Sequence, residues 1–218
     1  MNIIDLPNEI LVNIIKHLSD KYKINLLTTC KFLNKLKYSV YFTKFYKLSK
    51  IINCDFIDRF KNILIYNNND LEYLHKINKS DINILKLCFI VNKINENIPK
   101  NIKSLVFMKN IDNFNLNHIP RDVLYLVFYS NFGELEPNYF TNLNIITLYN
   151  YNIQLKPNTF PETLTYLKLV NYNKELVKDS LPKNLKTLIM FDYNNSLEYL
   201  PKNLEILELF NFNKELLL

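Results

Sequence analysis

The sequence has 218 residues, of which 48% are hydrophobic, and a formal net charge of +6. This apolar content is that of a packed globular protein and excludes a wholly disordered chain. No run approaches the roughly 18 to 20 apolar residues that span a membrane, and the N-terminus lacks a long apolar signal segment. We therefore expect a cytoplasmic or nuclear protein that has no membrane partner.

The excess of basic residues raises the question of nucleic-acid binding, because lysine and arginine neutralise phosphates. Eight lysines concentrate near the N-terminus: Lys21, Lys23, Lys31, Lys35, Lys37, Lys44, Lys47 and Lys50. They lie among apolar residues with helical spacing, which is typical of the solvated face of helices. We expect no nucleic acid among the partners, and steeply salt-dependent binding to random RNA or DNA would contradict this expectation.

The N-terminal region has the spacing of amphipathic helices. Positions 10, 11, 14, 15 and 18 are apolar, which predicts a helix that begins near Asp5 or at Leu6-Pro7. A proline at the first helical position loses no hydrogen bond. A second helical pattern follows over residues 24–36. Helices this short are unstable alone, so they must pack on each other and on another part of the chain.

The same region carries a family resemblance. The motif Leu6-Pro7-x-Glu9-Ile10-Leu11-x-x-Ile14-Ile15-x-x-Leu18, followed by Leu26-Leu27-x-x-Cys30-Lys31, resembles an F-box. The resemblance implies a three-helix motif that docks on the Skp adaptor of a cullin-based ubiquitin ligase. Carried over by matching position, the adaptor contacts would come from Leu6, Pro7, Ile10, Leu11, Ile14 and Leu18. In the second half Phe32-Leu33 stands where many family members carry a tryptophan.

Two interpretations of these apolar residues stay open. A helix that is apolar around much of its circumference needs two partners, its own core and an external groove, which favours adaptor docking. Alternatively, all of these residues form the core of an N-terminal cap on the rest of the chain. Co-purification with a Skp adaptor distinguishes the two.

The middle of the chain is less regular. Residues 42–52 continue a helical pattern, residues 59–66 have the pattern of a degenerate first repeat, and residues 67–70 predict a turn. A short amphipathic segment follows over residues 71–77. We therefore divide the chain into an F-box over residues 1–45, a connecting segment with a degenerate capping repeat over 46–79, and a solenoid over 80–218.

From residue 80 onward the sequence repeats itself. Apolar anchors recur every 19 to 21 residues, which is the period of a solenoid, at Leu85, Leu105, Leu126, Ile146, Leu167, Leu188 and Leu207. The residues three before and two after each anchor are also apolar. An anchor and the residue two after it share one face of a strand, so stacked copies predict a parallel sheet. The predicted fold class is α+β, a small helical F-box followed by a leucine-rich-repeat-like solenoid of about seven copies.

Two further features recur in the array. Proline stands six residues before most anchors, outside the strand, where its missing donor does no harm. An aromatic residue and Asn follow five and six residues after the later anchors, at Tyr151-Asn152, Tyr172-Asn173, Tyr193-Asn194 and Phe212-Asn213. We expect the ring to fill the core and a buried Asn to hydrogen-bond the turn. The pattern resembles the FNIP repeat, which is found beside F-boxes in amoebal and large-virus proteins, and a viral source would imply the host cytoplasm.

The side chains that point away from the core are unusually apolar. One outward column reads Cys88, Met108, Tyr129, Tyr149, Val170, Phe191 and Phe210, and the other reads Ile84, Ser104, Tyr125, Ile145, Tyr166, Thr187 and Ile206. Exposed apolar patches mark binding sites, and aromatic residues dominate interface energetics. We predict a target-binding face formed by Tyr125, Tyr129, Tyr149, Tyr166, Phe191 and Phe210. The alternative is that these rings only pack laterally along the solenoid.

Nothing in the sequence favours catalysis. His17, His75 and His118 are scattered and form no zinc spacing, and a single glycine cannot build a phosphate loop. The three cysteines, Cys30, Cys54 and Cys88, are an odd number without close pairing, so we expect reduced, buried thiols. We expect no cofactor and no metal.

The predicted function is that of a non-catalytic substrate-recognition adaptor of a Skp-cullin-F-box ubiquitin ligase. The helices would recruit the ligase, and the solenoid would hold an unidentified target protein near it. The alternative is a stand-alone interaction or inhibitory scaffold whose helices act only as a cap. The last leucines, Leu216, Leu217 and Leu218, either fold back over the core, pair with another molecule or fray.

Overall fold

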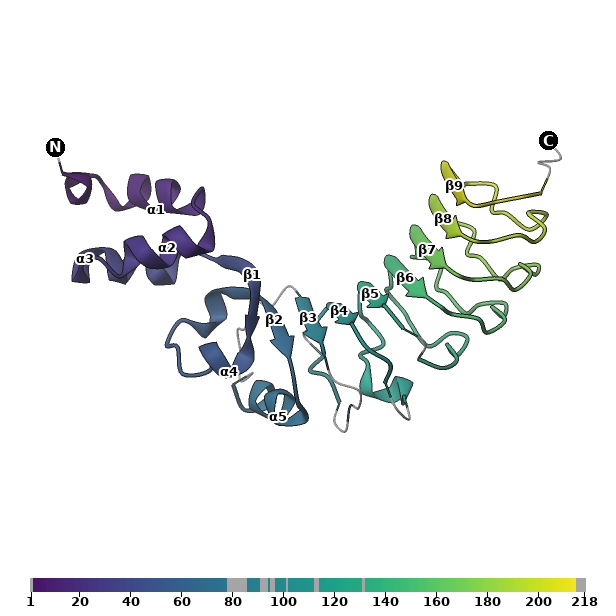
Figure 1. Cartoon of the computed structure of the whole chain (residues 1–218), viewed down its shortest axis with the longest axis horizontal. Coiled ribbons are helices and arrows are strands. Elements are labelled where there is room, and N and C mark those ends of the chain that lie inside the picture. The colour runs from purple at the N-terminus through teal and green to yellow at the C-terminus, as the bar shows by residue number, and fades with distance from the viewer. Residues whose placement is uncertain are drawn as a thin grey trace.

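The computed structural model describes residues 2–77, 86–90, 94, 97–100, 102–111, 114–130 and 132–214. Short helices lie at the N-terminal end of an arc of parallel strands, and the strands line its concave side (Figure 1). The predicted positions Ile84, Leu85 and Leu216–Leu218 lie outside the described residues. The arrangement confirms the predicted fold class, N-terminal helices followed by a parallel-sheet solenoid.

The N-terminal elements include the helix predicted from the Leu-Pro motif. They are the 3-10 helix η1 (Ile3–Asp5), α1 (Asn8–Lys16), α2 (Asp20–Leu27), α3 (Lys31–Asn34) and the 3-10 helix η2 (Lys35–Ser39). Pro7 occupies the N-cap position of α1, and its carbonyl oxygen accepts hydrogen bonds from the N–H groups of Ile10 and Leu11, each at 3.0 Å. The proline therefore begins the helix without removing one of its hydrogen bonds.

The second helical pattern is not continuous, which corrects the prediction for residues 24–36. The hydroxyl of Thr28 lies 3.0 Å from the carbonyl oxygen of Ile24, and that of Thr29 donates to the carbonyl oxygen of Leu26 at 2.7 Å. Such side-chain bonds compete with the backbone ladder and end α2. Cys30 follows with extended backbone at the N-cap of α3 and is exposed, so the prediction that this thiol is buried was wrong.

Residues 42–52 were predicted to be helical, but most of this segment is a strand. Strand β1 (Phe42–Lys47) precedes the short helix α4 (Leu48–Ile51) and pairs with β2 (Phe60–Ile65). The rings of Phe42 and Tyr46 pack on the ring of Phe60 in β2, with centroids 4.9 and 4.8 Å apart. Packing across the strand pair, which the local apolar spacing does not reveal, selects the extended conformation.

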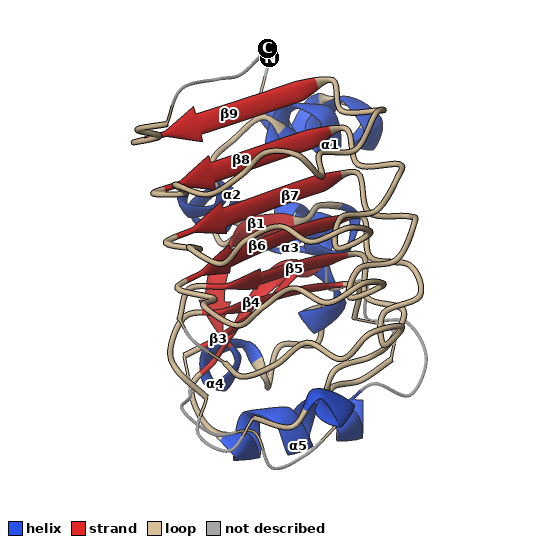
Figure 2. Ribbon diagram, turned by 90° about the vertical axis from the view of Figure 1, so that its right-hand side faces the viewer, coloured by secondary structure: helices blue, strands red, loops and turns tan. Residues whose placement is uncertain are grey.

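A single nine-stranded parallel sheet joins all the described strands in chain order (Figure 1). Figure 2 shows the later strands of this sheet stacked one above another. After β1 the strands are β2 (Phe60–Ile65), β3 (Lys86–Phe89), β4 (Ser104–Phe107), β5 (Tyr125–Phe128), β6 (Ile145–Tyr149), β7 (Tyr166–Val170), β8 (Thr187–Phe191) and β9 (Ile206–Phe210). Between them lie η3 (Ile57–Arg59), α5 (Asn68–Ile77) and η4 (Leu116–His118). The predicted degenerate repeat at residues 59–66 contains β2, and the amphipathic segment at 71–77 lies within α5.

The register of the sheet corrects the first repeat. Leu87, not Leu85, pairs with the anchor Leu105, and Phe89 pairs with Phe107. Cys88 therefore lies one residue after its anchor rather than three, opposite Val106. The equal spacing predicted from Leu85 was misleading because only 18 residues separate Leu87 from Leu105, whereas the next two intervals are 21 and 20 residues. The apolar residues of this copy fit either register.

The core of the solenoid is built from the predicted inward columns. From β4 to β8 the anchors and the residues two after them are at most 1% exposed. Phe89, Phe107 and Phe128 stack in this column, with successive ring centroids 5.0 and 4.7 Å apart. Each of these strands thus adds one layer to a continuous core, whereas the anchor Leu207 of β9 is 37% exposed. The N-terminal helices contribute Leu11 and Ile15 to the same core.

The turn after each later strand is held by a tyrosine hydroxyl. Tyr151, Tyr172 and Tyr193 are at most 1% exposed, and their hydroxyls accept hydrogen bonds from the backbone N–H groups of Leu135, Leu155 and Leu176, at 3.2 to 3.3 Å. The predicted core position of the ring is confirmed. The predicted burial of the following Asn was wrong, because Asn152 and Asn173 are exposed.

A different Asn column is required by the backbone. Asn150, Asn171 and Asn211 have φ of 57°, 58° and 59°, and Asp192 has φ of 61°. Asn and Asp tolerate this left-handed region better than other residues with a side chain, so they take the place that glycine fills elsewhere. The amide of Asn171 also donates to the side-chain oxygen of Asn150 at 2.7 Å, which links neighbouring turns.

Candidate protein-interaction surfaces

Helix α1 presents apolar side chains on two sides. Leu11 and Ile15 are 0% exposed and lie in the core, whereas Ile10 and Ile14 are 48% and 39% exposed. The spacing of 3.6 residues per turn explains this division, because residues 10 and 14 share one face and residues 11 and 15 the next. One face of α1 is thus packed within the chain, and the neighbouring face is free to meet a partner.

The six residues predicted to contact the adaptor do not all lie on this free face. Pro7, Ile10 and Ile14 are exposed, Leu6 and Leu18 are half-buried, and Leu11 is in the core. The structure therefore places the side chain of Leu11 where it supports α1 from within. Ile3 and Ile4, which were not in the predicted set, are 40% and 42% exposed and lie in η1, shortly before α1 in the chain. We call Ile3, Ile4, Ile10 and Ile14 the helix α1 surface.

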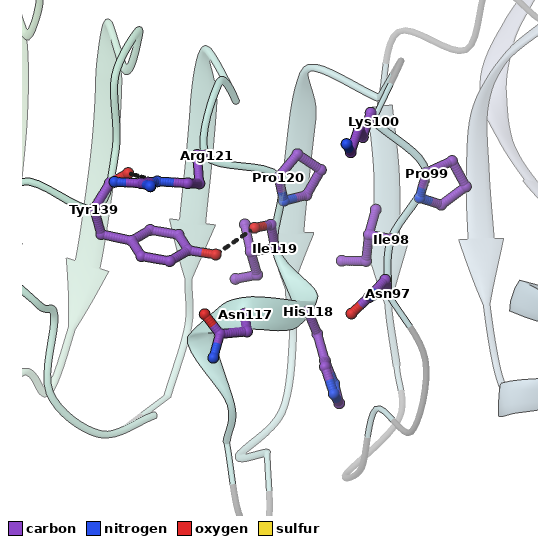
Figure 3. Close-up of a pocket in the computed structure, with 10 residues that line it drawn as sticks. All are labelled: Asn97, Ile98, Pro99, Lys100, Asn117, His118, Ile119, Pro120, Arg121 and Tyr139. Carbon is purple, nitrogen blue, oxygen red and sulfur yellow. Dashed lines mark hydrogen bonds between the residues drawn. The ribbon is translucent and has the colours of Figure 1, made fainter.

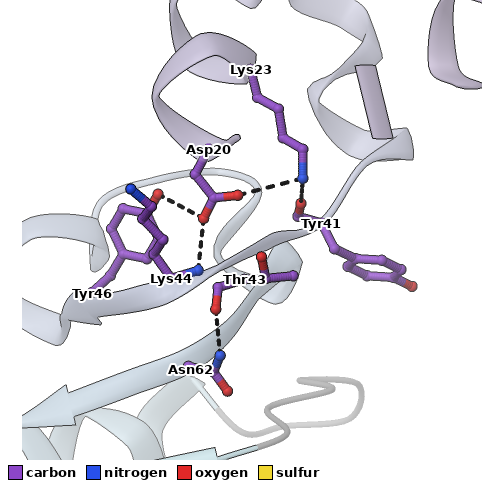
Figure 4. Close-up of polar contacts among 7 residues, drawn as sticks. All are labelled: Asp20, Lys23, Tyr41, Thr43, Lys44, Tyr46 and Asn62. Carbon is purple, nitrogen blue, oxygen red and sulfur yellow. Dashed lines mark hydrogen bonds and ion pairs between the residues drawn. The ribbon is translucent and has the colours of Figure 1, made fainter. Parts of the chain in front are cut away.

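A buried polar cluster joins α2 to the first strand of the solenoid (Figure 4). Asp20 and Lys23 are 2% and 5% exposed, and the ammonium of Lys23 lies 3.4 Å from the carboxylate of Asp20. The same carboxylate accepts hydrogen bonds from the backbone N–H of Lys44 at 2.8 Å and from the hydroxyl of Tyr46 at 3.0 Å. Lys23 also donates to the carbonyl oxygen of Tyr41 at 2.8 Å.

This cluster fixes the helices against the sheet. Burial, together with the hydrogen bond to Asp20, raises the pKa of Tyr46, so its phenol remains a donor at neutral pH. Two ionised groups buried together are stable only when each is satisfied by partners, and the partners here belong to α2 and β1. The cluster therefore couples the orientation of the helix α1 surface to that of the solenoid.

The six predicted target-binding residues all lie on the concave side of the sheet. Tyr129, Tyr149, Phe191 and Phe210 lie three residues after their anchors, and Tyr125 and Tyr166 lie one residue before theirs. Tyr129 stacks on Tyr149 with centroids 4.8 Å apart, and Phe191 stacks on Phe210 at 4.2 Å. The structure brings the set together as two rows of rings across neighbouring strands. We call this surface the concave face.

The rings of the concave face are packed laterally yet remain accessible. Tyr129 and Phe210 are each 42% exposed, and the other four members are half-buried. Burial is the main cause of the raised pKa of Tyr125, to which the neighbouring Tyr129, Tyr166 and Tyr149 add. The raised pKa keeps the Tyr125 hydroxyl a neutral donor at physiological pH.

A middle row between the two rows of rings was missing from the predicted face. It consists of the residues one after each anchor, namely Val106, Val127, Thr147, Lys168, Ile189 and Glu208. Val106 and Val127 form a small second core with Cys88, covered by Leu64 and Tyr125. Strict alternation from the anchor would have identified this row in the sequence.

Two lysines approach the rings of this face. The ammonium of Lys86 lies 4.4 Å from the centre of the Tyr125 ring, and that of Lys168 lies 4.9 Å from the centre of the Phe191 ring. Cations within about 6 Å of a ring centre are attracted by its electron-rich face. The concave face therefore combines aromatic surface with positive charge.

A hollow of about 500 Å³ lies at the side of the repeats that contain β4 and β5, among Pro99, Pro120, Arg121 and Tyr139 (Figure 3). The side chains of Arg121 and Tyr139 bond within the chain. Arg121 donates to the carbonyl oxygens of Tyr139 and Asn138 at 2.9 and 3.0 Å, and the Tyr139 hydroxyl lies 2.7 Å from the carbonyl oxygen of Ile119. These bonds tie consecutive repeats together.

Within the described residues, no group of His, Cys, Asp and Glu side chains could hold a metal ion. In the same part of the chain, every helix is too short or too polar to cross a membrane. Burial raises the pKa of the thiols of Cys54 and Cys88, which disfavours the reactive thiolate form. Both the helix α1 surface and the concave face include exposed apolar side chains, among them Ile10, Ile14, Tyr129 and Phe210.

Comparison with protein families gives two matches. Residues 3–45 match the model described as F-box domain, and residues 149–192 match the model described as FNIP Repeat. The first match spans η1, α1, α2, α3 and η2 and the start of β1, and the second extends from the end of β6 into the turn after β8.

The chain is also similar to proteins of Acanthamoeba polyphaga mimivirus. A putative F-box and FNIP repeat-containing protein is 30% identical over 110 residues, which cover 49% of this chain and 33% of that protein. A putative F-box protein is 40% identical over 74 residues, covering 32% of this chain and 34% of the relative. The chain thus spans about a third of the length of these relatives.

One solved structure shares the fold. The crystal structure of CroV588, described as a novel circular LRR protein, superimposes with a TM-score of 0.60 at 24% identity. The match covers 72% of this chain and 25% of that one. At this identity the likeness concerns the fold alone, a parallel-sheet solenoid of the leucine-rich-repeat type.

Proposed function

Since the chain carries an F-box domain and FNIP repeats, we propose that it is the substrate-recognition adaptor of a Skp-cullin-F-box ubiquitin ligase. The helix α1 surface docks on the Skp-type subunit, and the concave face binds a target protein. The adaptor contributes no chemistry of its own. It raises the effective concentration of the target near the ubiquitin-charged enzyme, which is supplied by its partners.

The observation that carries this proposal is the division of α1 into two apolar faces. A helix that only capped the solenoid would need one buried face, and Leu11 and Ile15 already supply it. Ile10 and Ile14 remain 48% and 39% exposed, and Ile3 and Ile4 are also exposed. An apolar helix face that is free in the isolated chain suits a groove on another protein.

Co-purification of the full chain with a Skp-type adaptor tests the proposal. The double change Ile10→Arg and Ile14→Arg places two charges on the docking face and should abolish co-purification. Asn13→Arg adds a charge at an exposed position of the same helix outside the helix α1 surface and serves as the control. Leu11→Arg is not a suitable test because Leu11 is buried, so its loss of binding would also follow from unfolding.

The alternative is a stand-alone interaction or inhibitory scaffold whose helices act only as a cap. It is favoured by the continuity of the core, since Leu11, Ile15 and Leu27 belong to the same cluster as the solenoid. A folded chain that fails to co-purify with any Skp-type adaptor, or a double Arg variant that still binds, would refute the ligase proposal and leave this one.

The target-binding part of the proposal is tested separately. Proteins crosslinked to the concave face of the full chain would identify a target. The double change Tyr129→Ala and Tyr149→Ala removes a stacked pair of rings and should weaken the affinity for that target at least tenfold. Unchanged affinity in a folded double variant would mean that these rings only pack along the solenoid.

A further inference from the structure

The middle row of the concave face carries two opposite charges on either side of an apolar residue. Lys168 in β7 pairs in register with Ile189 in β8, which pairs with Glu208 in β9. Lys168 and Ile189 are half-buried, and Glu208 is exposed. Apolar side chains stand beside this row on both sides, among them Tyr166, Val170, Phe191, Ile206 and Phe210.

Neither charge is neutralised within the described part of the chain. Among those residues no ion pair involves Lys168 or Glu208, and the ammonium of Lys168 instead faces the Phe191 ring at 4.9 Å. A purely apolar partner would remove water from both charges without replacing it, which is strongly unfavourable. A partner that covers this face must therefore bring an anion to Lys168 and a cation to Glu208.

The spacing of the two charges selects the conformation of the partner. Adjacent strands are about 4.8 Å apart, so Lys168 and Glu208 are separated by roughly 10 Å along the arc, with Ile189 halfway. In an α-helix, residues seven apart are about 10.5 Å apart on one face, and the residue three or four along lies between them. In an extended segment, residues on one side recur about every 6.7 Å, so charges roughly 7 or 13 Å apart do not match.

We propose that the concave face over β7, β8 and β9 binds an amphipathic helix with an acidic residue at i, an apolar residue at i+3 or i+4, and a basic residue at i+7. The acidic residue pairs with Lys168, the apolar residue packs on Ile189, and the basic residue pairs with Glu208. The helix lies across the strands, and the flanking rows contact its sides. The proposal rests on the proposed target-binding role of this face and defines the class of target segment.

Peptide binding to the full chain tests this proposal. Three labelled helical peptides of 20 residues share the same leucines and differ only at positions i and i+7, which carry Glu and Lys, Glu and Glu, or Lys and Lys. A fourth peptide carries Glu at i and Lys at i+5, which turns the lysine away from Glu208. Fluorescence anisotropy measures the affinity of each peptide for the natural chain, for Lys168→Glu and for Glu208→Lys.

The natural chain should bind the Glu and Lys peptide at least about tenfold more tightly than the other three, because each of those leaves a charge unpaired. Lys168→Glu should instead prefer the Lys and Lys peptide, and Glu208→Lys should prefer the Glu and Glu peptide. The same ranking in all three proteins, or no binding of any peptide up to about 1 mM, would overturn the proposal.

The peptide-binding measurement does not depend on binding of the Skp-type adaptor to the helix α1 surface. Lys168 and Glu208 lie in β7 and β9, far along the arc from α1, so both variants should co-purify with a Skp-type adaptor as the natural chain does (Figure 1). Loss of peptide selectivity with normal adaptor binding would refute the helix proposal alone. Normal peptide selectivity without adaptor binding would refute the ligase proposal alone.

Discussion

Tyr172 illustrates how single residues hold this solenoid together. Its ring is fully buried, and its hydroxyl accepts a hydrogen bond from the backbone N–H of Leu155 in the preceding repeat at 3.3 Å. Tyr151 and Tyr193 make the same contact one repeat before and one after. Because the repeats contain almost no glycine, polar side chains satisfy the turns that a more flexible backbone would arrange differently.

Tyr172→Phe should reduce the free energy of unfolding by about 1 to 2 kcal/mol, because the N–H of Leu155 loses its acceptor in a buried site. Urea unfolding followed by circular dichroism measures the change. Tyr129→Phe is the control, because Tyr129 is 42% exposed and loss of its hydroxyl should change the free energy of unfolding little. Equal effects of the two substitutions would contradict the assigned role of the Tyr172 hydroxyl.

The same residue predicts a dependence on alkaline pH. Burial raises the pKa of Tyr172 to about 12, whereas an unfolded tyrosine titrates near about 10. Between these values the unfolded chain has lost a proton that the folded chain keeps, so stability is complete below about pH 10 and falls as the pH approaches about 12. Tyr172→Phe should show a shallower loss over this range, and an identical slope would contradict the prediction.

Asn171 has a left-handed backbone conformation that limits which residues can replace it. Its φ of 58° is unfavourable for residues with a β-carbon, and its amide also donates to Asn150. Asn171→Ala should lower the free energy of unfolding by about 1 to 2 kcal/mol, and Asn171→Gly should lower it less because glycine adopts this conformation freely. Thermal melting compares the two, and a glycine variant less stable than the alanine variant would contradict the backbone argument.

At the scale of elements, the junction between α2 and β1 decides how the two surfaces are placed. The buried carboxylate of Asp20 forms an ion pair with Lys23 and accepts hydrogen bonds from the N–H of Lys44 and the hydroxyl of Tyr46. Ionised groups so deeply buried are stabilising only as a complete set. The helices are therefore attached to the solenoid by a specific contact rather than by a flexible tether.

Asp20→Ala should destabilise the junction by about 3 to 5 kcal/mol, because it leaves the Lys23 ammonium buried without its carboxylate. Glu205→Ala is the matched control. It removes an ion pair with Lys186 in which both side chains are more than half exposed, so it should change stability by at most about 1 kcal/mol.

Urea unfolding measures both changes. Spin labels at the exposed positions Asn13 and Lys202 measure the distribution of distances between α1 and the solenoid, which should broaden in the Asp20 variant. An unchanged distance distribution, together with unchanged stability, would show that the cluster does not set the orientation.

Periodic elements could be predicted from the sequence, and elements fixed by distant contacts could not. The anchors Leu105 to Leu188 predict their strands correctly, because each copy buries the anchor and the residue two after it. Strand β1 escaped prediction because Phe42 and Tyr46 are positioned by Phe60, eighteen and fourteen residues away. The break at Thr28 and Thr29 depends on hydroxyl contacts that apolar spacing does not encode.

The candidate surfaces were predictable to a similar degree. Alternation placed Tyr129 and Phe191 on one face, and the structure brings them together with the other predicted rings. The same alternation also places Lys168 and Glu208 on this face, but a prediction based on aromatic residues alone leaves their row out. Leu11 could not be separated from Ile10 by its residue type, because only the packing of α1 shows which face is covered.

At the scale of the whole molecule, the arc separates two free surfaces and holds them in a fixed relation. The helix α1 surface lies at the N-terminal end, and the concave face over β7 to β9 lies toward the other end (Figure 1). The strands from β4 to β8 each add one layer to the main core, so the distance between the surfaces is set by the number of repeats. Such an arrangement suits a protein that holds one partner at a set distance from another.

Hydrogen exchange of the full chain, with and without a purified Skp-type adaptor, tests this account most directly. We predict that the adaptor slows exchange in η1 and α1, over residues 3–16, and leaves β7 to β9 unchanged, because the proposed function assigns different partners to the two surfaces. Ile10→Arg with Ile14→Arg should abolish that protection. Unchanged exchange in α1 at saturating adaptor, or protection confined to the sheet, would contradict the account.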